Sequence, residues 1–231
     1  MAAPPAGAVN PRIRPALLGA ATFALATLLL KPLAHTAIGL PASGALFVLG
    51  GALIAGLSEE LARAGALRWG RLGDLAAAQR AFAFAVGYAL TEAVLVGVIA
   101  PLQLMHLAEQ PAVVASLPAA QREAVERQIA AIGALTPLWL LIERTGAAVA
   151  QMGFGWLVWQ AIAHRRLAWV GGAIALHAAI DVPAAGFQSG WWPLWAVELL
   201  YLGIALLAAP RVVRAWRAAL SPAPAPAATS G

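Results

Sequence analysis

The stretch GALFVLGGALIAGLSEELARAG, residues 44–65, decides how this chain must fold. Residues 44–57 carry no charge, and Glu59, Glu60 and Arg63 follow within the same apolar run. A helix needs about 20 predominantly apolar residues to cross the hydrocarbon core of a bilayer. We therefore predict a transmembrane helix that carries ionisable side chains inside the membrane.

The rest of the chain has the same apolar character. Its 231 residues are 61% hydrophobic and 11% charged, with a mean hydropathy of +0.78, whereas a soluble domain is about a quarter charged. We predict an all-α fold, a polytopic membrane helix bundle of about six transmembrane helices. There is no cysteine, which excludes disulfides and thiolate metal sites. The predicted spans are residues 16–34, 44–67, 81–105, 135–163, 167–187 and 191–209.

Three segments flank or interrupt the predicted bundle, which we place at residues 16–210. Residues 1–15 form a short cytoplasmic segment, and residues 211–231 form a tail that is first basic and then Pro/Ala-rich, the part after Leu220 being expected to be disordered. Residues 106–133 form an extramembrane connector, in which residues 116–118 (SLP) begin a short helix. We expect this connector on the outer membrane surface, where it either gates access to the bundle or spaces two helices.

Positive charge is distributed unevenly between the two sides of the predicted bundle. The outer loops hold only Arg122 and Arg127, whereas the cytoplasmic segments hold Arg12, Arg14, Arg68, Arg71, Arg80, Arg165, Arg166, Arg211, Arg214 and Arg217. The positive-inside rule then places both termini in the cytoplasm of an integral protein of, we expect, the bacterial cytoplasmic (inner) membrane. This placement accounts for the net charge of +5 without a nucleic-acid partner. Lys31 is the exception, and because Pro32 follows it we expect the ammonium to snorkel to the interface.

Six of the ten acidic residues fall inside the predicted spans. A charge near the bilayer centre costs roughly 2.5 to 3.5 kcal/mol on insertion scales, so these residues need partners in the bundle interior or a polar cavity. Glu92, near the middle of its span, is expected to share such a cavity with others. We expect Glu198 to be exposed at the outer interface, and Glu143 with Arg144 either to dock a helix or to take part in chemistry. The six are Glu59, Glu60, Glu92, Glu143, Asp181 and Glu198.

Two groups of ionisable side chains share a helix face. Arg63 lies three residues after Glu60 and four after Glu59, so its guanidinium can reach either carboxylate. His177 and Asp181 are one turn apart on another span. A carboxylate there can fix the tautomer of an imidazole that binds a metal, donates to an oxyanion or shuttles a proton. Both groups predict a functional site.

These elements, in this order, resemble a known family. The chain carries EExxR at residues 59–63, GYALTEA with Glu92, ER at residues 143–144 and HxxxD at residues 177–181. The combination is similar to the YhfC family of intramembrane peptidases, relatives of the CPBP group of CAAX-prenyl and bacteriocin-processing proteases. The likeness extends over residues 15–187 and includes PALLGAATFALATLLLKPL at its start.

The resemblance implies a helical protease in the lipid bilayer, in which a glutamate activates water for attack on a peptide carbonyl of a membrane-associated protein or peptide substrate. The chain departs from the family pattern at two histidine positions, where it has Tyr88 and Gln151. By position, the implied site residues are the catalytic carboxylates Glu59 and Glu60, their charge partner Arg63, and the final pair His177 and Asp181.

The cofactor requirement stays open in the sequence. Known zinc hydrolases use two or three histidine ligands, whereas a single histidine lies within the predicted spans. We therefore favour metal-free chemistry without a cofactor, in which Glu60 or Glu59 is the general base and His177 stabilises the oxyanion or protonates the leaving amine. The alternative is a zinc site built from Glu60, Glu92, His177 and Asp181.

Two other functions fit the same residues. A catalytically inactive protease homologue could keep the cavity to bind membrane proteins or lipids. Intramembrane Glu, Asp and His also serve as proton relays, so a proton-coupled membrane transporter is a further alternative. Such transporters often have two related halves, and the first three predicted spans show no repeat in the last three.

Overall fold

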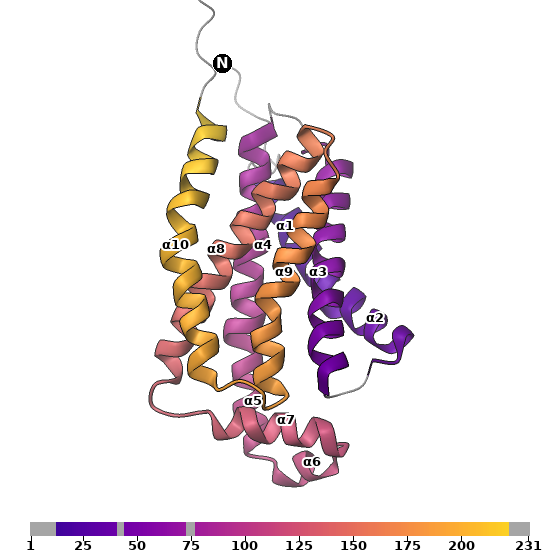
Figure 1. Cartoon of the computed structure of the whole chain (residues 1–231), viewed down its shortest axis with the longest axis vertical. Helices are drawn as coiled ribbons and strands as arrows, with labels where there is room; N and C mark the ends of the chain where they lie inside the picture. The colour runs from indigo at the N-terminus through magenta and orange to yellow at the C-terminus, as the bar shows by residue number, and fades with distance from the viewer. Residues whose placement is uncertain (1–12, 41–43, 73–76, 222–231) are drawn as a thin grey trace, which may run out of the picture.

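The computed structural model describes residues 13–40, 44–72 and 77–221. These residues are almost entirely helical and include no strand, which confirms the predicted all-α membrane bundle (Figure 1). The predicted N-terminal segment up to residue 12, with Arg12, lies outside the described residues, as does the Pro/Ala-rich end of the tail from residue 222.

Two of the long apolar runs contain a π-helical turn just before a proline. They consist of α1 (Ile13–Leu25), η1 (Ala26–Leu30) and α2 (Lys31–Ile38), and of α4 (Ala78–Val94), η3 (Leu95–Ile99) and α5 (Ala100–Ala108). Pro32 and Pro101 have no amide hydrogen, and their rings crowd the carbonyl four residues earlier. The helix widens to a π turn at both places, a feature that is frequent at functional sites. These turns lie next to Lys31 and Glu92, and α2 points away from the bundle (Figure 1).

The remaining long helices are α3 (Gly44–Trp69), α8 (Thr136–Ala163), α9 (Ala168–Gln188) and α10 (Leu194–Leu220). Five helical runs of the described chain are long and apolar enough to cross a membrane: Ile13–Ile38, Gly44–Trp69, Ala78–Ala108, Ala168–Gln188 and Leu194–Leu220. Side chains such as Leu46, Leu49 and Leu53 on α3 are exposed on the outside, as expected for a surface that faces lipid.

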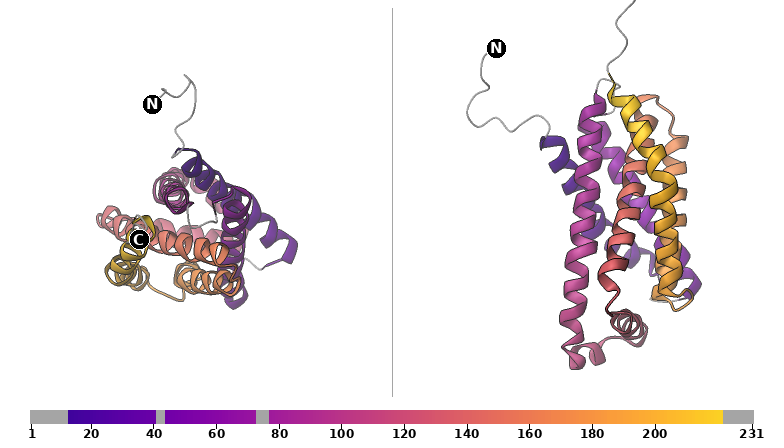
Figure 2. Two further views of the ribbon diagram at one scale, coloured as in Figure 1. Left: turned by 90° about the horizontal axis from the view of Figure 1, so that it is seen from above. Right: turned by 90° about the vertical axis from the view of Figure 1, so that its left-hand side faces the viewer.

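The fourth predicted span, which corresponds to α8, differs from these five. It is 28 residues long but less apolar. It contacts α3, α4, α9 and α10, and Figure 2 shows it among them. Because few of its side chains face lipid, α8 can carry polar residues that an outer helix would not tolerate.

The last helix extends past the end predicted at residue 209. The buried Trp216 donates its indole N–H to the carbonyl oxygen of Met152 on α8, at 3.0 Å. This contact holds the basic continuation of α10 against the bundle. The basic part of the predicted tail is therefore helical from residue 211 as far as Leu220.

The connector lies at one end of the bundle (Figure 1). It contains α6 (Pro111–Ser116) and α7 (Ala119–Ala130), and α7 is the helix predicted after residues 116–118. Arg127 on α7 donates two hydrogen bonds to the carbonyl oxygen of Gln188, from Nε at 3.1 Å and from Nη2 at 2.8 Å. These bonds fasten α7 to the end of α9.

A close crossing of α3 and α9 positions the polar interior. A Cβ atom added to Gly56 on α3 would lie 2.7 Å from the carbonyl oxygen of Ile174 on α9. Only glycine allows the two backbones to approach this closely. Glu60 lies one turn after Gly56, and His177 lies one turn after Ile174. The crossing therefore brings the two predicted groups of ionisable residues into reach of each other.

Candidate active site

Eight side chains from five helices meet inside the bundle. Those of Glu59, Glu60, Arg63, Tyr88, Gln151 and His177 are buried, with no more than 4% of each residue exposed. Burying so many polar groups is costly unless each is paired with another. The eight are Lys31 of α2, Glu59, Glu60 and Arg63 of α3, Tyr88 of α4, Gln151 of α8, and His177 and Asp181 of α9.

Glu60 connects the two groups that the sequence predicted. Its Oε1 lies 2.7 Å from Nδ1 of His177, and its Oε2 lies 3.1 Å from Nε of Arg63. Arg63 therefore pairs with Glu60, three residues earlier, and its direct ion pair is not with Glu59. A carboxylate held at both oxygens is well placed to orient an imidazole and poorly placed to move.

His177 is held in a fixed orientation. Its ring stacks on Phe154, with ring centroids 4.8 Å apart and planes 7° from parallel. Nε2 lies 3.6 Å from Oδ2 of Asp181 and 3.9 Å from Oε1 of Glu59. We expected Asp181 to fix the ring, but Glu60 makes the shorter contact, because the crossing at Gly56 brings α3 so close. The free nitrogen faces the space between Glu59 and Asp181.

Glu59 is bound by residues of three other helices. Its Oε2 accepts hydrogen bonds from Oη of Tyr88 at 3.0 Å and from Nε2 of Gln151 at 3.2 Å. Its Oε1 forms an ion pair with the ammonium of Lys31. Glu59 is thus balanced by a cation that the sequence motif EExxR does not contain.

The prediction that Lys31 snorkels to the interface is wrong. Its ammonium turns into the bundle, because a carboxylate within reach in low-dielectric surroundings attracts it strongly. A signal was present in the sequence: a lysine in an apolar span is a functional-site candidate by default. The sequence alone could not show that the start of α2 lies close to Glu59.

Tyr88 and Gln151 stand at the two positions where the chain departs from the family pattern. Both contact the charged residues of the central group. Gln151 accepts hydrogen bonds from Arg63 at its side-chain oxygen and, at 2.8 Å, at its backbone carbonyl oxygen. The guanidinium of Arg63 lies over the ring of Tyr88, with its carbon 4.0 Å from the ring centroid. Phe23 packs edge-on against the same ring, with centroids 5.1 Å apart. Both residues therefore connect Arg63 to Glu59.

A second charged cluster lies beside the first. Nη1 of Arg144 is 3.4 Å from Oε1 of Glu92, and Nη2 of Arg144 pairs with the adjacent Glu143. The prediction that Glu143 and Arg144 help to dock a helix fits this geometry, since Arg144 connects α8 to α4. Glu92 points to Arg144 rather than to His177, so the structure does not bring it into contact with the central group.

The prediction for the exposure of Glu198 is wrong. We expected it to be exposed at the interface, but it is 2% exposed, and its Oε2 has no hydrogen-bond partner in the described part of the chain. The reason is that one face of α10, with Val197 and Tyr201, packs against α8 and α9 and buries Glu198 on the same side of the helix.

The donor set does not fit a zinc site. Glu92 pairs with Arg144, which separates it from the other residues of the zinc alternative. Within residues 13–40, 44–72 and 77–221, no group of three or more His, Asp or Glu side chains is arranged to hold a metal ion. The two central glutamates already face the cations Lys31 and Arg63, which would repel a divalent ion. The alternative ligands were Glu60, Glu92, His177 and Asp181.

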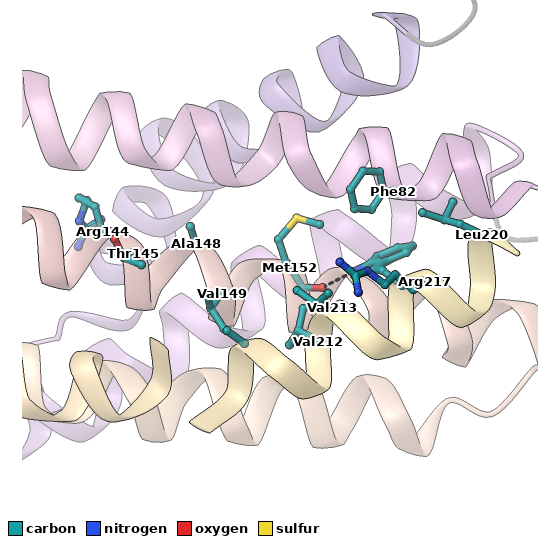
Figure 3. Close-up of a pocket in the computed structure, with 12 residues that line it drawn as sticks. Phe82, Arg144, Thr145, Ala148, Val149, Met152, Val212, Val213, Arg217 and Leu220 are labelled. Atoms are coloured by element: carbon teal, nitrogen blue, oxygen red, sulfur yellow. Dashed lines mark hydrogen bonds between the residues drawn. The ribbon is translucent and has the colours of Figure 1, made fainter. Parts of the chain in front are cut away.

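A groove on the side of the bundle has a different character. It has a volume of about 610 Å³ and lies between α4, α8 and α10 (Figure 3). Arg144 lies at one end and Arg217 at the other, with apolar side chains such as Met152 and Val212 between them. No carboxylate or imidazole is among the described residues that line it, so the groove is not the candidate active site.

Comparison with known proteins gave a match to a protein family. The family model described as YhfC intramembrane metalloprotease matches residues 9–202. These residues include all eight side chains of the central group and the second charged cluster. No curated protein and no solved structure matched the chain.

Proposed function

This chain belongs to the YhfC intramembrane metalloprotease family, and we propose that it is an intramembrane endopeptidase that cleaves membrane-associated proteins by glutamate chemistry. The observation that carries the proposal is the contact between Glu60 and His177 beside the second glutamate, Glu59. Glu59, as a base, and His177, as an acid, then face the same space inside the bilayer.

The two adjacent glutamates take different roles. Glu60 contacts Nδ1 of His177 and so orients the ring with Nε2 facing Glu59. The same arrangement of carboxylate and imidazole orients the histidine in serine proteases. Glu60 is therefore a positioning residue. Glu59, on the opposite side of the ring, is the general base.

The reaction starts with a water molecule that contacts both Nε2 of His177 and Oε1 of Glu59, whose 3.9 Å separation allows one water to hydrogen-bond both. Glu59 takes a proton from this water, and the resulting hydroxide attacks the peptide carbonyl carbon. His177 acts as an imidazolium, whose Nδ1–H donates to Glu60 and whose Nε2–H stabilises the oxyanion of the tetrahedral intermediate. Collapse breaks the C–N bond, and the leaving amine receives the proton that Glu59 took.

Lys31 has a role in the same cycle. Its ammonium balances the carboxylate of Glu59 at the start. Once Glu59 carries a proton, that positive charge is available to the oxyanion. Lys31 and Asp181 are the least buried of the central group, with side chains 23% and 30% exposed. The substrate therefore approaches from their side.

The orientation in the membrane is part of the proposal. The ends of α3, α8 and α10 and the beginning of α4 carry the arginines predicted to be cytoplasmic, and they lie at the end of the bundle opposite α7 (Figure 1). We place that end in the cytoplasm of a bacterial cell and α7 on the outer surface of its inner membrane.

The test uses the full chain in proteoliposomes with tagged single-span substrates. Cleavage by the parent should be lost in Glu59→Gln and in His177→Ala and strongly reduced in Glu60→Ala. Glu126→Gln is the matched control, because this glutamate is exposed and lies on the connector helix α7. Unchanged cleavage in the Glu59 and His177 variants would overturn the assignment.

A second candidate function is a catalytically inactive homologue that binds membrane proteins or lipids. Its support is that both oxygens of Glu59 are occupied by Lys31, Tyr88 and Gln151, and that the groove of Figure 3 offers apolar walls between two arginines. Tight binding of a single-span peptide without any cleavage would favour this candidate.

A further inference from the structure

A cavity of about 490 Å³ lies at the connector end of the bundle, between α5, α7, α8, α9 and α10. Most of its walls are apolar, with Leu104, Leu140 and Phe187 among them. Two carboxylates, Glu143 and Glu198, also line it. None of the described residues that line it carries a positive charge.

The charges around this cavity do not balance. Arg144 is already paired with Glu143 and Glu92, and Glu198 forms no ion pair within the described residues. Two carboxylates thus share one guanidinium, and Glu198 has no such partner. Glu198 is 2% exposed, and its Oε2 lacks a hydrogen-bond partner among the described residues. A buried carboxylate without a partner is costly, so the cavity is built to receive a positively charged group.

The walls indicate what kind of cation fits. Calcium and magnesium take six or more oxygen ligands, whereas here two carboxylates stand among apolar side chains. Lysine and arginine have long apolar stems that lie along such walls and a charged end that reaches a carboxylate. We propose that this cavity is a substrate subsite that binds a lysine or arginine side chain of the polypeptide, a proposal that rests on the endopeptidase function above.

The position of the cavity predicts the distance to the cleaved bond. Ala184 of α9 lines the cavity and lies seven residues after His177, on the same face of the helix. Seven residues of helix span about 10 Å, which equals about three residues of extended chain. Cleavage should therefore fall about three residues from the bound basic residue.

The experiment measures binding and cleavage separately. Single-span peptides carry one lysine three residues from a cleavable bond, and matched peptides carry methionine in its place. Binding to the full chain in micelles is followed by fluorescence anisotropy with Glu59→Gln as the non-cleaving background, and cleavage is followed with the parent. We expect the lysine peptide to bind about 10- to 100-fold more tightly than the methionine peptide. Glu198→Gln should remove this difference, and Glu126→Gln should keep it.

The outcomes separate the subsite from the endopeptidase function. Lysine-dependent binding that needs Glu198, without cleavage by the parent, supports the subsite and contradicts the proposed function. Cleavage without a lysine preference contradicts the subsite and leaves the function standing. Inhibition by free butylamine without a lysine preference in the peptides would also overturn the subsite. The thermal midpoint of Glu198→Gln should equal or exceed that of the parent, since the variant removes an unpartnered charge; Glu198→Met is the second variant if it does not.

Discussion

Nδ1 of His177 lies 2.7 Å from Oε1 of Glu60, although 117 residues of sequence separate them. The other oxygen of Glu60 faces Arg63, so this carboxylate has no freedom to approach a substrate. The neighbouring Glu59 faces the opposite nitrogen of the same ring. This difference in contacts is why we propose distinguishable roles for the two adjacent glutamates, one positioning and one reacting.

This division predicts different kinetics for two similar substitutions. Glu59→Gln removes the general base and should lower kcat about 100- to 10,000-fold. Glu60→Gln keeps the side-chain shape but weakens the orientation of His177, so kcat should fall with little change in KM. Steady-state cleavage assays in proteoliposomes measure both. If Glu59→Gln and Glu60→Gln both changed KM equally and left kcat unchanged, the division of roles would be contradicted.

Lys31 should contribute to both stability and activity through Glu59. Lys31→Met leaves Glu59 buried without its cation and should lower the free energy of unfolding by about 1 to 3 kcal/mol. Lys31→Arg keeps the charge and should retain most of the stability. The double variant Lys31→Met, Glu59→Gln should lose less than the sum of the two single changes, as measured by SDS unfolding in micelles. If the losses of unfolding free energy in the two single variants add up to that of the double variant, Lys31 and Glu59 are not coupled.

The crossing at Gly56 should be as important as the polar residues themselves. Gly56→Ala places a methyl group 2.7 Å from the carbonyl oxygen of Ile174, which forces α3 and α9 apart and moves Glu60 from His177. We expect a loss of about 1 to 3 kcal/mol in stability and a fall in kcat. Gly172→Ala on α9 is the matched control, because an added Cβ there meets nothing within 4 Å. A similar loss in both variants would contradict the role of the crossing.

The sequence predicted the helices well and the contacts between them poorly. Apolar length alone located the spans, and the spacing from Glu60 to Arg63 predicted their pairing, because both are local properties of one helix. The contact of Glu60 with His177 and the turn of Lys31 toward Glu59 depend on how helices cross, which no periodicity encodes. Glu198 shows the same limit: its depth in the span suggested exposure, and packing at the start of α10 buried it.

The donor set predicts that removal of metal ions leaves activity intact. Lys31 and Arg63 already neutralise the central glutamates, and Glu92 is held by Arg144. Cleavage after dialysis against EDTA or 1,10-phenanthroline should match that of the untreated protein within twofold. Elemental analysis should find less than stoichiometric zinc. Loss of activity on chelation, restored by added zinc, would contradict glutamate chemistry and favour the zinc alternative.

The hydrogen bonds from Arg127 to the carbonyl oxygen of Gln188 should control access at the connector end. They hold α7 against the end of α9, and Gln188 also lines the cavity that contains Glu198. Arg127→Gln cannot make both bonds, so amide exchange in α7 should become faster, while exchange in α3 should stay unchanged. Arg122→Gln on the same helix is the control. Because a looser α7 admits substrate more readily but holds it less firmly, the substrate dissociation rate should rise more than the association rate. Unchanged exchange in α7 would show that the connector only spaces two helices.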